Sequence, residues 1–330
     1  MFNTPILFIT FIRLDTAKKV FERIRQIQPK KLFIASDGPR KNKPEDKKKC
    51  DAVKNYILNN IDWDCDVHTL FRTENLGCGR GVSTAISWFF ENVEQGIILE
   101  DDCVPSMSFF PFCENLLNKY KNEKSVYHIS GNNKIGINKR PNNESYSFAA
   151  IEECWGWATW KNRWEKFEYK ITPDYEKLKE HPYFQKKYRQ KFWFQTFEEM
   201  SKDDNTGIWD FQYTYMILLN KGFCITPAKN LISNIGFGKD STHFENGSAG
   251  LEMPSYEIDE IIHPKKLEFD WKLIKYVDRK VRGIPRGFFT PKYILFLLSR
   301  VIIFFPKLIL SKMGIYDKIK DSVKICSQFL

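Results

Sequence analysis

Three consecutive carboxylates end an apolar run near residue 100. The segment 97–102 reads Ile-Ile-Leu-Glu-Asp-Asp, so a buried strand would carry Glu100, Asp101 and Asp102 to the edge of a sheet. A divalent cation that is held by one or two carboxylates, with water at its other positions, neutralises a departing diphosphate. Side chains alternate along a strand, so we expect one of the three carboxylates to bind metal directly. A solvated acidic strand end is the alternative.

Asp210 supplies a further carboxylate in the segment 207–213, which reads Gly-Ile-Trp-Asp-Phe-Gln-Tyr. Direct displacement with inversion requires a base that deprotonates the attacking hydroxyl, and a carboxylate can take this role. The residues from 210 to 220 also have the pattern of a helix, for which Asp210 would serve as the N-cap. The two roles do not exclude each other.

Repeated strand and helix patterns must position these carboxylates. Strands are expected over 5–11, 31–36, 66–71, 96–99, 125–130 and 145–150, and helices over 15–27, after Pro44 and over 81–92. Strand–helix units of this length predict an α/β fold with a mostly parallel sheet and helices on both faces.

One edge of the predicted sheet gathers polar residues. In such sheets, ligands bind beyond the carboxyl ends of the strands. Arg13 and Asp37 follow the first two strands, the glycine-containing loop 72–81 follows the third, and the acidic triplet Glu100-Asp101-Asp102 follows the fourth. These four groups along one edge predict a binding crevice.

The order of these motifs resembles the GT-A fold of nucleotide-sugar glycosyltransferases. Residues 3–250 resemble the N-acetylglucosaminyltransferase I-like group and the bacterial hemolysin-related glycosyltransferases. The resemblance implies a Rossmann-like sheet, a UDP-sugar donor and Mn²⁺ or Mg²⁺ as cofactor. It also implies that Asp102 binds the metal, that Asp101 lies near the ribose and that Glu100 lies near the donor sugar.

The same resemblance implies donor contacts from other segments. Asp37 matches an aspartate that binds uracil, and Arg13 matches an arginine that approaches the diphosphate. Arg80, in the loop 72–81, would reach the donor phosphates or the sugar. As alternatives, Asp37 forms a turn before Gly38-Pro39, and the loop 72–81 is a plain flexible connection.

Acceptor-side roles are also implied by the resemblance. Asp210 matches the catalytic base, and Trp209 would stack on a sugar ring. The segment Trp155-Gly156-Trp157 matches one that lines the donor and acceptor site in the family, with core packing as the alternative.

A later polar segment matches a loop that closes over the donor in the family. Ser241 and Thr242 would face the phosphates, and His243 would be a second metal candidate. A solvated histidine in a polar loop is the alternative for His243.

Positive charge concentrates near the end of the chain. The formal net charge is +10, and from residue 260 onward fifteen Lys and Arg stand against six Asp and Glu. Along 291–310, Lys292, Arg300 and Lys307 gather on one stripe of a helical projection, opposite a wide apolar face. This pattern predicts an interfacial helix on an anionic membrane surface and argues against a nucleic-acid partner. Packing of the helix on the catalytic domain is the alternative.

We therefore expect a GT-A domain over 1–252 and a basic amphipathic region over 253–330 that attaches to the membrane interface. The eight cysteines include no C-x-x-C pair. The apolar segment 5–11 lacks the basic flank of a signal peptide. These features predict a cytoplasmic protein, peripheral at the inner face of the cell membrane.

The predicted reaction is inverting transfer of a sugar from a UDP-sugar to a glycan or lipid-linked acceptor, in the synthesis of cell-surface polysaccharide or lipopolysaccharide. UDP-N-acetylglucosamine is a candidate donor. One alternative is a sugar-nucleotidyltransferase, which normally needs a glycine-rich first loop, whereas segment 10–19 contains no glycine. The other is a non-catalytic membrane-attached scaffold, which would lack metal-dependent UDP binding.

Overall fold

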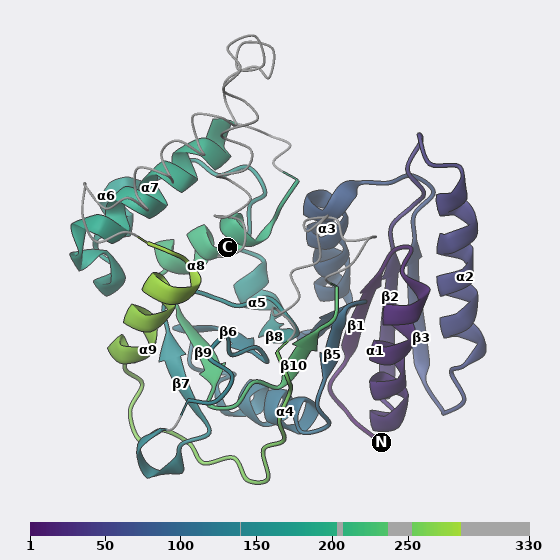
Figure 1. The fold of residues 1–330 in the computed structure, drawn as a ribbon, viewed down its shortest axis with the longest axis horizontal. Coiled ribbons are helices and arrows are strands. Elements are labelled where there is room, and N and C mark those ends of the chain that lie inside the picture. Colours follow the sequence, from purple (N-terminus) through teal and green to yellow (C-terminus); the bar gives the residue numbers. More distant parts are fainter. Residues whose placement is uncertain (139, 203–206, 237–252, 285–330) are drawn as a thin grey trace, which may run out of the picture.

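The chain folds around one large sheet of eight strands, in the order β3-β2-β1-β4-β8-β6-β9-β7 (Figure 1). The computed structural model describes residues 1–138, 140–202, 207–236 and 253–284. The first four strands in that order are parallel, as are β6 and β9, while β8 and β7 run antiparallel to their neighbours. The prediction of an α/β fold with a mostly parallel sheet is confirmed.

The strands of the large sheet are short. They are β1 (Ile6–Thr10), β2 (Lys31–Ser36), β3 (Asp66–Phe71), β4 (Gln95–Glu100), β6 (Val126–Ser130), β7 (Tyr146–Ala149), β8 (Trp157–Trp160) and β9 (Phe223–Pro227). A second sheet pairs β5 (Cys103–Pro105) with β10 (Ile232–Asn234) in antiparallel orientation.

Helices cover both faces of the large sheet. The α-helices of the described residues are α1 (Leu14–Ile27), α2 (Glu45–Asn59), α3 (Gly77–Asn92), α4 (Phe109–Lys119), α5 (Lys161–Trp164), α6 (Tyr175–Lys179), α7 (Lys187–Lys202), α8 (Asp210–Leu219) and α9 (Trp271–Tyr276). The core on one face includes residues of α1, α2 and α4, and the core on the other includes residues of α3, α5 and α8.

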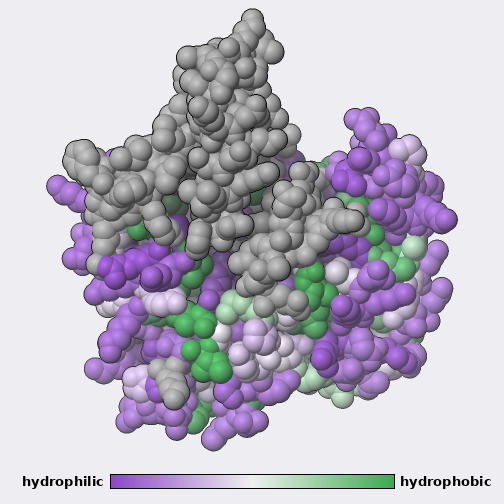
Figure 2. Space-filling view, viewed as in Figure 1, coloured by the Kyte–Doolittle hydropathy of each residue, from purple (hydrophilic) through white to green (hydrophobic). Residues whose placement is uncertain are grey.

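Alternate residues of β1 enter these two cores. Ile6 and Phe8 pack with α1 and α2, whereas Leu7 and Ile9 pack with α3. A strand that is buried on both faces needs apolar residues at every position, which explains the continuous apolar run in the sequence. The outer side of α2, by contrast, forms part of the hydrophilic surface in Figure 2.

A third core joins α6 and α7 to α9 beside the β7 end of the sheet (Figure 1). The segment 253–284 contributes to this third core and also contacts the residues just before α4. The carboxylate of Glu257 accepts hydrogen bonds from the backbone N–H groups of Met107 (3.0 Å) and Ser108 (2.7 Å). Asp278 forms a buried ion pair with Arg189 in α7 (2.7 Å). The predicted boundary at 252/253 adjoins undescribed residues and stays a prediction.

The predicted interfacial helix over 291–310 lies outside the described residues. Within the described ranges, the helices are too short or too polar to span a bilayer. The seven cysteines of those ranges are free thiols.

Candidate active site

A pocket lies at the carboxyl ends of β1, β2 and β4, where the sequence predicted a crevice. It encloses about 720 Å³ of space, part of which is open to solvent. Four predicted site residues line it, namely Arg13, Asp37, Glu100 and Asp101. The remaining wall comes from β1, from the connection after β2 and from the start of α3. It includes Arg72, Asn75 and Cys78 of the predicted loop 72–81, and also Phe11 and Arg40, which sequence reasoning did not identify.

The acidic triplet is tied to the end of β1 by Arg13. Its guanidinium donates to Asp101 and lies 2.9 Å from Oδ2 of Asp102. The backbone N–H of Phe11 donates to the other Asp101 oxygen, at 3.2 Å. Burial lowers the pKa of Arg13, but the two carboxylates outweigh that effect and raise it overall.

Burial also shifts the carboxylates of the triplet. It raises the pKa of Asp101 to about 6, against the opposing charge of Arg13. The pKa of Glu100 is raised to about 8, first by burial and then by the negative charges of Asp102 and Asp101. Three carboxylates beside one guanidinium form an environment in which a further cation would be stabilised.

Asp102 is the predicted metal ligand, and its surroundings limit how a cation could be held. Within the described residues, no three His, Cys, Asp or Glu side chains converge on one point as a metal cage would require. Mg²⁺ and Mn²⁺ suit a site with one or two carboxylates completed by substrate phosphates and water. The triplet therefore fits a cation that shares its coordination with a diphosphate.

The chain after β10 returns to the same point. The N–H of Ile235 donates to the carbonyl of Asp102 at 2.9 Å, and Gly236 lies so close to the Asp102 carboxylate that an added Cβ would overlap it. The predicted closing loop with Ser241, Thr242 and His243 follows Gly236 in sequence, but those three residues lie outside the described residues. Their predicted roles are untested.

Asp37 has a structural role that the sequence did not indicate. Its carboxylate accepts hydrogen bonds from the N–H groups of Leu76 (3.0 Å) and Gly77 (3.1 Å) and from the amide of Asn75 (2.9 Å). Asp37 thus caps α3, which explains why this helix begins at Gly77 and not at 81 as predicted. Contact of Asp37 with uracil stays a prediction.

Arg80 lies in the first turn of α3 and is exposed. Its guanidinium stands 4.5 Å from the ring centre of Tyr169. It is not among the residues that line the pocket. Because 77–81 is helical, the alternative of a plain flexible loop is wrong for that part of 72–81.

Asp210 lies near the acidic triplet although it belongs to a distant part of the sequence. It is the first residue of α8, with Trp209 at the N-cap position, so Asp210 itself is not the N-cap. Its negative charge contributes to the raised pKa of Glu100 and to the raised pKa of Cys78, which lines the pocket. A separate carboxylate from a distant part of the sequence therefore acts electrostatically on two residues that line the pocket.

Glu152 is a further carboxylate of this region that sequence reasoning missed. It is 6% exposed and accepts a short hydrogen bond from the hydroxyl of Thr214, one helical turn after Asp210. Burial, followed by the charges of Asp210 and Glu153, raises the pKa of Glu152 to about 8. Two acidic residues directly after the apolar run 148–151 were the signal that could have identified it.

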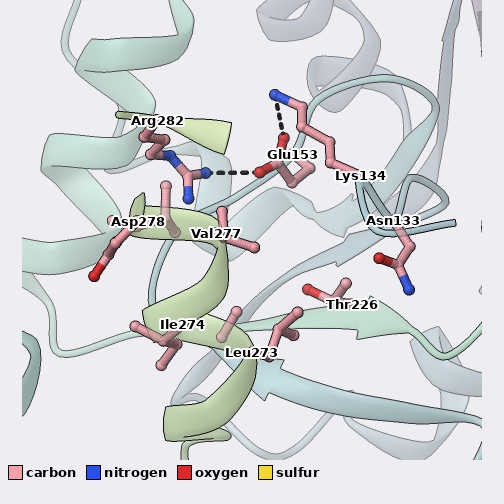
Figure 3. A pocket seen from close by; sticks show the side chains of 11 residues that line it. Asn133, Lys134, Glu153, Thr226, Leu273, Ile274, Val277, Asp278 and Arg282 are labelled. Atoms are coloured by element: carbon pink, nitrogen blue, oxygen red, sulfur yellow. Dashed lines mark hydrogen bonds and ion pairs between the residues drawn. The ribbon is translucent and has the colours of Figure 1, made fainter. Parts of the chain in front are cut away.

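The neighbouring Glu153 is paired and anchors the segment after α9. It lies 2.8 Å from Lys134 and 2.7 Å from Arg282 (Figure 3). Burial raises the pKa of Glu153, but these two cations outweigh that effect and hold the pKa below its usual value. The pKa values of the adjacent Glu152 and Glu153 are therefore shifted in opposite directions.

Trp209 is part of the core, which corrects the prediction that it stacks on a sugar ring. Its side chain is 3% exposed, and its ring stacks on Trp157 with centres 5.7 Å apart. Trp157 is itself buried, so core packing is right for this member of the 155–157 segment. Trp155 is partly exposed, with Lys134 5.3 Å from its ring centre.

No family model and no curated protein matches the sequence. Among solved structures, apo UDP-glucose pyrophosphorylase is 10% identical, with a TM-score of 0.36 over 71% of this chain and 93% of its own. HddC from Yersinia pseudotuberculosis is 10% identical, with a TM-score of 0.32 over 49% and 78%. The 4-diphosphocytidyl-2C-methyl-D-erythritol synthase from Anaerococcus prevotii is 12% identical, with a TM-score of 0.30 over 54% and 83%. These similarities concern the fold, and TM-scores this low carry no argument about the reaction.

Proposed function

We propose that the chain is a metal-dependent, inverting glycosyltransferase that uses a UDP-sugar, with UDP-N-acetylglucosamine as a candidate donor. The observation that carries the proposal is that the negative charge of Asp210, which comes from a distant part of the sequence, acts on Glu100 and Cys78, both of which line the pocket at the ends of three parallel strands. Sugar transfer needs both a diphosphate site and a separate base for the acceptor hydroxyl. The pocket and Asp210 match these two needs.

In this proposal the residues of the chain divide the work. Asp102 would hold Mn²⁺ or Mg²⁺, which neutralises the leaving diphosphate when bound. Asp210 takes the proton from the acceptor hydroxyl, whose oxygen forms the new bond to the anomeric carbon. The bond between that carbon and the diphosphate oxygen breaks, and UDP leaves with the electron pair. Arg13 lies where it can contact a phosphate, because it is at the mouth of the same pocket.

Nucleotidyl transfer, which the sequence left as an alternative, is the second candidate. Two of the similar structures have names that denote pyrophosphorylase and diphosphocytidyl chemistry. That reaction attacks with a phosphate oxygen that is already ionised, and it needs no base such as Asp210. It also requires groups that surround a triphosphate. Here only residues 11–13 connect β1 to α1, and they include no glycine. These features favour sugar transfer.

A substitution at Asp210 tests the proposal. Asp210→Asn should abolish sugar transfer while UDP binding in the presence of Mn²⁺ is kept, and the exposed control Asp64→Asn should behave as the wild type. Transfer at the wild-type rate by Asp210→Asn would refute the assigned base. Formation of UDP-sugar and pyrophosphate from UTP and a sugar 1-phosphate would instead establish the second candidate. Absence of metal-dependent UDP binding would favour a scaffold.

The acceptor and the location of the protein are also proposals. The basic, amphipathic pattern of 291–310 supports peripheral attachment to an anionic membrane surface and hence a lipid-linked or cell-surface glycan as acceptor. Sedimentation with phosphatidylglycerol vesicles tests this, with phosphatidylcholine vesicles as the control. Equal binding to both, or to neither, would contradict electrostatic attachment.

A further inference from the structure

Both oxygens of the Asp102 carboxylate already have partners in the described protein. Nη2 of Arg13 lies 2.9 Å from Oδ2, and the thiol of Cys103 donates to Oδ1 at 3.3 Å. The backbone at Gly236 covers the same ion pair, because a Cβ there would overlap Oδ2 and come within 2.9 Å of Nη1 of Arg13. A cation that approaches Asp102 alone therefore meets a bound guanidinium.

If Arg13 left Asp102, only its pair with Asp101 would remain. Its guanidinium also donates to Asp101, whose side chain is 4% exposed, so both partners of Arg13 belong to the triplet. Exchange of Asp102 for water would cost Arg13 a charge-assisted hydrogen bond. A diphosphate offers Arg13 acceptor oxygens of equal charge and offers the cation the ligands that the protein does not supply.

We propose that Arg13 holds the metal-binding carboxylate in the nucleotide-free protein, and that the site takes up its cation only together with a nucleoside diphosphate. This inference rests on the proposed function. The ligand of the pocket is then the metal–diphosphate complex, and neither the free cation nor the free nucleotide binds as tightly. On binding, Nη2 of Arg13 moves from Asp102 to a phosphate oxygen, and Asp102 contacts the cation.

Binding of Mn²⁺, measured by electron paramagnetic resonance, tests the exchange. Wild-type protein should bind Mn²⁺ weakly alone and at least about tenfold more tightly with UDP, as expected for one charged hydrogen bond exchanged. Arg13→Gln should bind Mn²⁺ about tenfold more tightly than the wild type without UDP, because the triplet loses its internal cation. Arg25→Gln, which removes an exposed guanidinium from the other end of α1, should leave this affinity unchanged.

Two results would overturn the inference: a wild-type protein that binds UDP but whose Mn²⁺ affinity does not depend on UDP, or no gain of nucleotide-free affinity in Arg13→Gln. Arg13→Lys keeps a cation at the position, so its nucleotide-free affinity for Mn²⁺ should rise little. Circular dichroism should show that all variants are folded. Failure of the proposed function is distinguishable, because it would appear as absence of UDP binding in the wild type. The nucleotide-free comparison of Arg13→Gln does not depend on that result.

Discussion

Gly79, in the first turn of α3, lies against the backbone of Ile208, two residues before Asp210. A Cβ atom at Gly79 would lie 2.9 Å from the nitrogen and from the oxygen of Ile208, and it would overlap the hydroxyl of Tyr169. The helix that lines the pocket thus touches the segment that carries the proposed base. This contact gives Gly79 a packing role.

Gly79→Ala should therefore shift Asp210 relative to the pocket. We expect a loss of sugar transfer of about tenfold to a hundredfold, because small misplacement of a reacting group is costly. The free energy of unfolding should fall by about 1–3 kcal/mol from overpacking. Steady-state kinetics and urea unfolding measure the two effects, with Glu91→Ala on the exposed side of α3 as the control. An unchanged transfer rate would contradict the proposed positioning of Asp210.

Glu152 should make stability depend on pH. Its pKa is raised to about 8 in the folded protein from an ordinary value of 4.5. Between these values the folded state binds more protons than the unfolded state, so the free energy of unfolding falls as pH rises. Glu152→Gln removes this titration and keeps an acceptor for Thr214. The fall in Tm between pH 5 and pH 9 should be smaller in this variant.

Glu100, whose pKa is also raised to about 8, leaves part of the pH dependence in Glu152→Gln. The exposed substitution Glu91→Gln should leave the wild-type profile unchanged. A Tm profile of Glu152→Gln parallel to that of the wild type would mean that Glu152 is ionised in the folded protein at neutral pH.

Trp209 should contribute to stability and not to sugar affinity. Its ring packs on Trp157 and lies 6.0 Å from the ring centre of Trp164. Trp209→Phe should lower the free energy of unfolding by about 1–3 kcal/mol, as for other losses of core volume. The KM for the sugar donor should stay within about twofold of the wild-type value, because a buried Trp209 makes no contact with the donor that the substitution could remove. A large rise in KM would instead support the predicted stacking of Trp209 on a sugar ring.

The sheet was predictable because its strands carry their own signal. Ile6–Ile9 and Ile97–Leu99 are apolar at every position, and burial on both faces demands this composition. The positions of Arg13, Asp37 and the acidic triplet followed, since they come directly after such strands. Local pattern was sufficient for this part of the site.

Contacts between distant segments decided what the sequence did not reveal. The start of α3 depends on Asp37, which follows β2 and caps the helix across the pocket. The burial of Trp209 depends on Trp157, which belongs to β8. Glu152 gains its position through Thr214 in α8. None of these pairs has a sequence spacing from which its contact could be read.

The buried ion pair between Asp278 and Arg189 tests the predicted domain boundary at 252/253. Both side chains are at most 3% exposed, and Asp278 also accepts a hydrogen bond from Tyr183 at 2.7 Å. Asp278→Asn would leave Arg189 buried without its charge partner and should cost about 3–5 kcal/mol of unfolding free energy. The control Glu176→Gln breaks an exposed pair with Lys179 and should cost less than about 1 kcal/mol.

A shortened chain extends the same test. Residues 1–252 lack Asp278 and α9, so this fragment should lose the cooperative urea transition of the full chain, because Arg189 and the third core are left uncovered. A chain that ends at residue 284 keeps both and should unfold cooperatively. If the 1–252 fragment unfolds with the same midpoint as the full chain, α9 belongs to the C-terminal region and the predicted boundary at 252/253 is right.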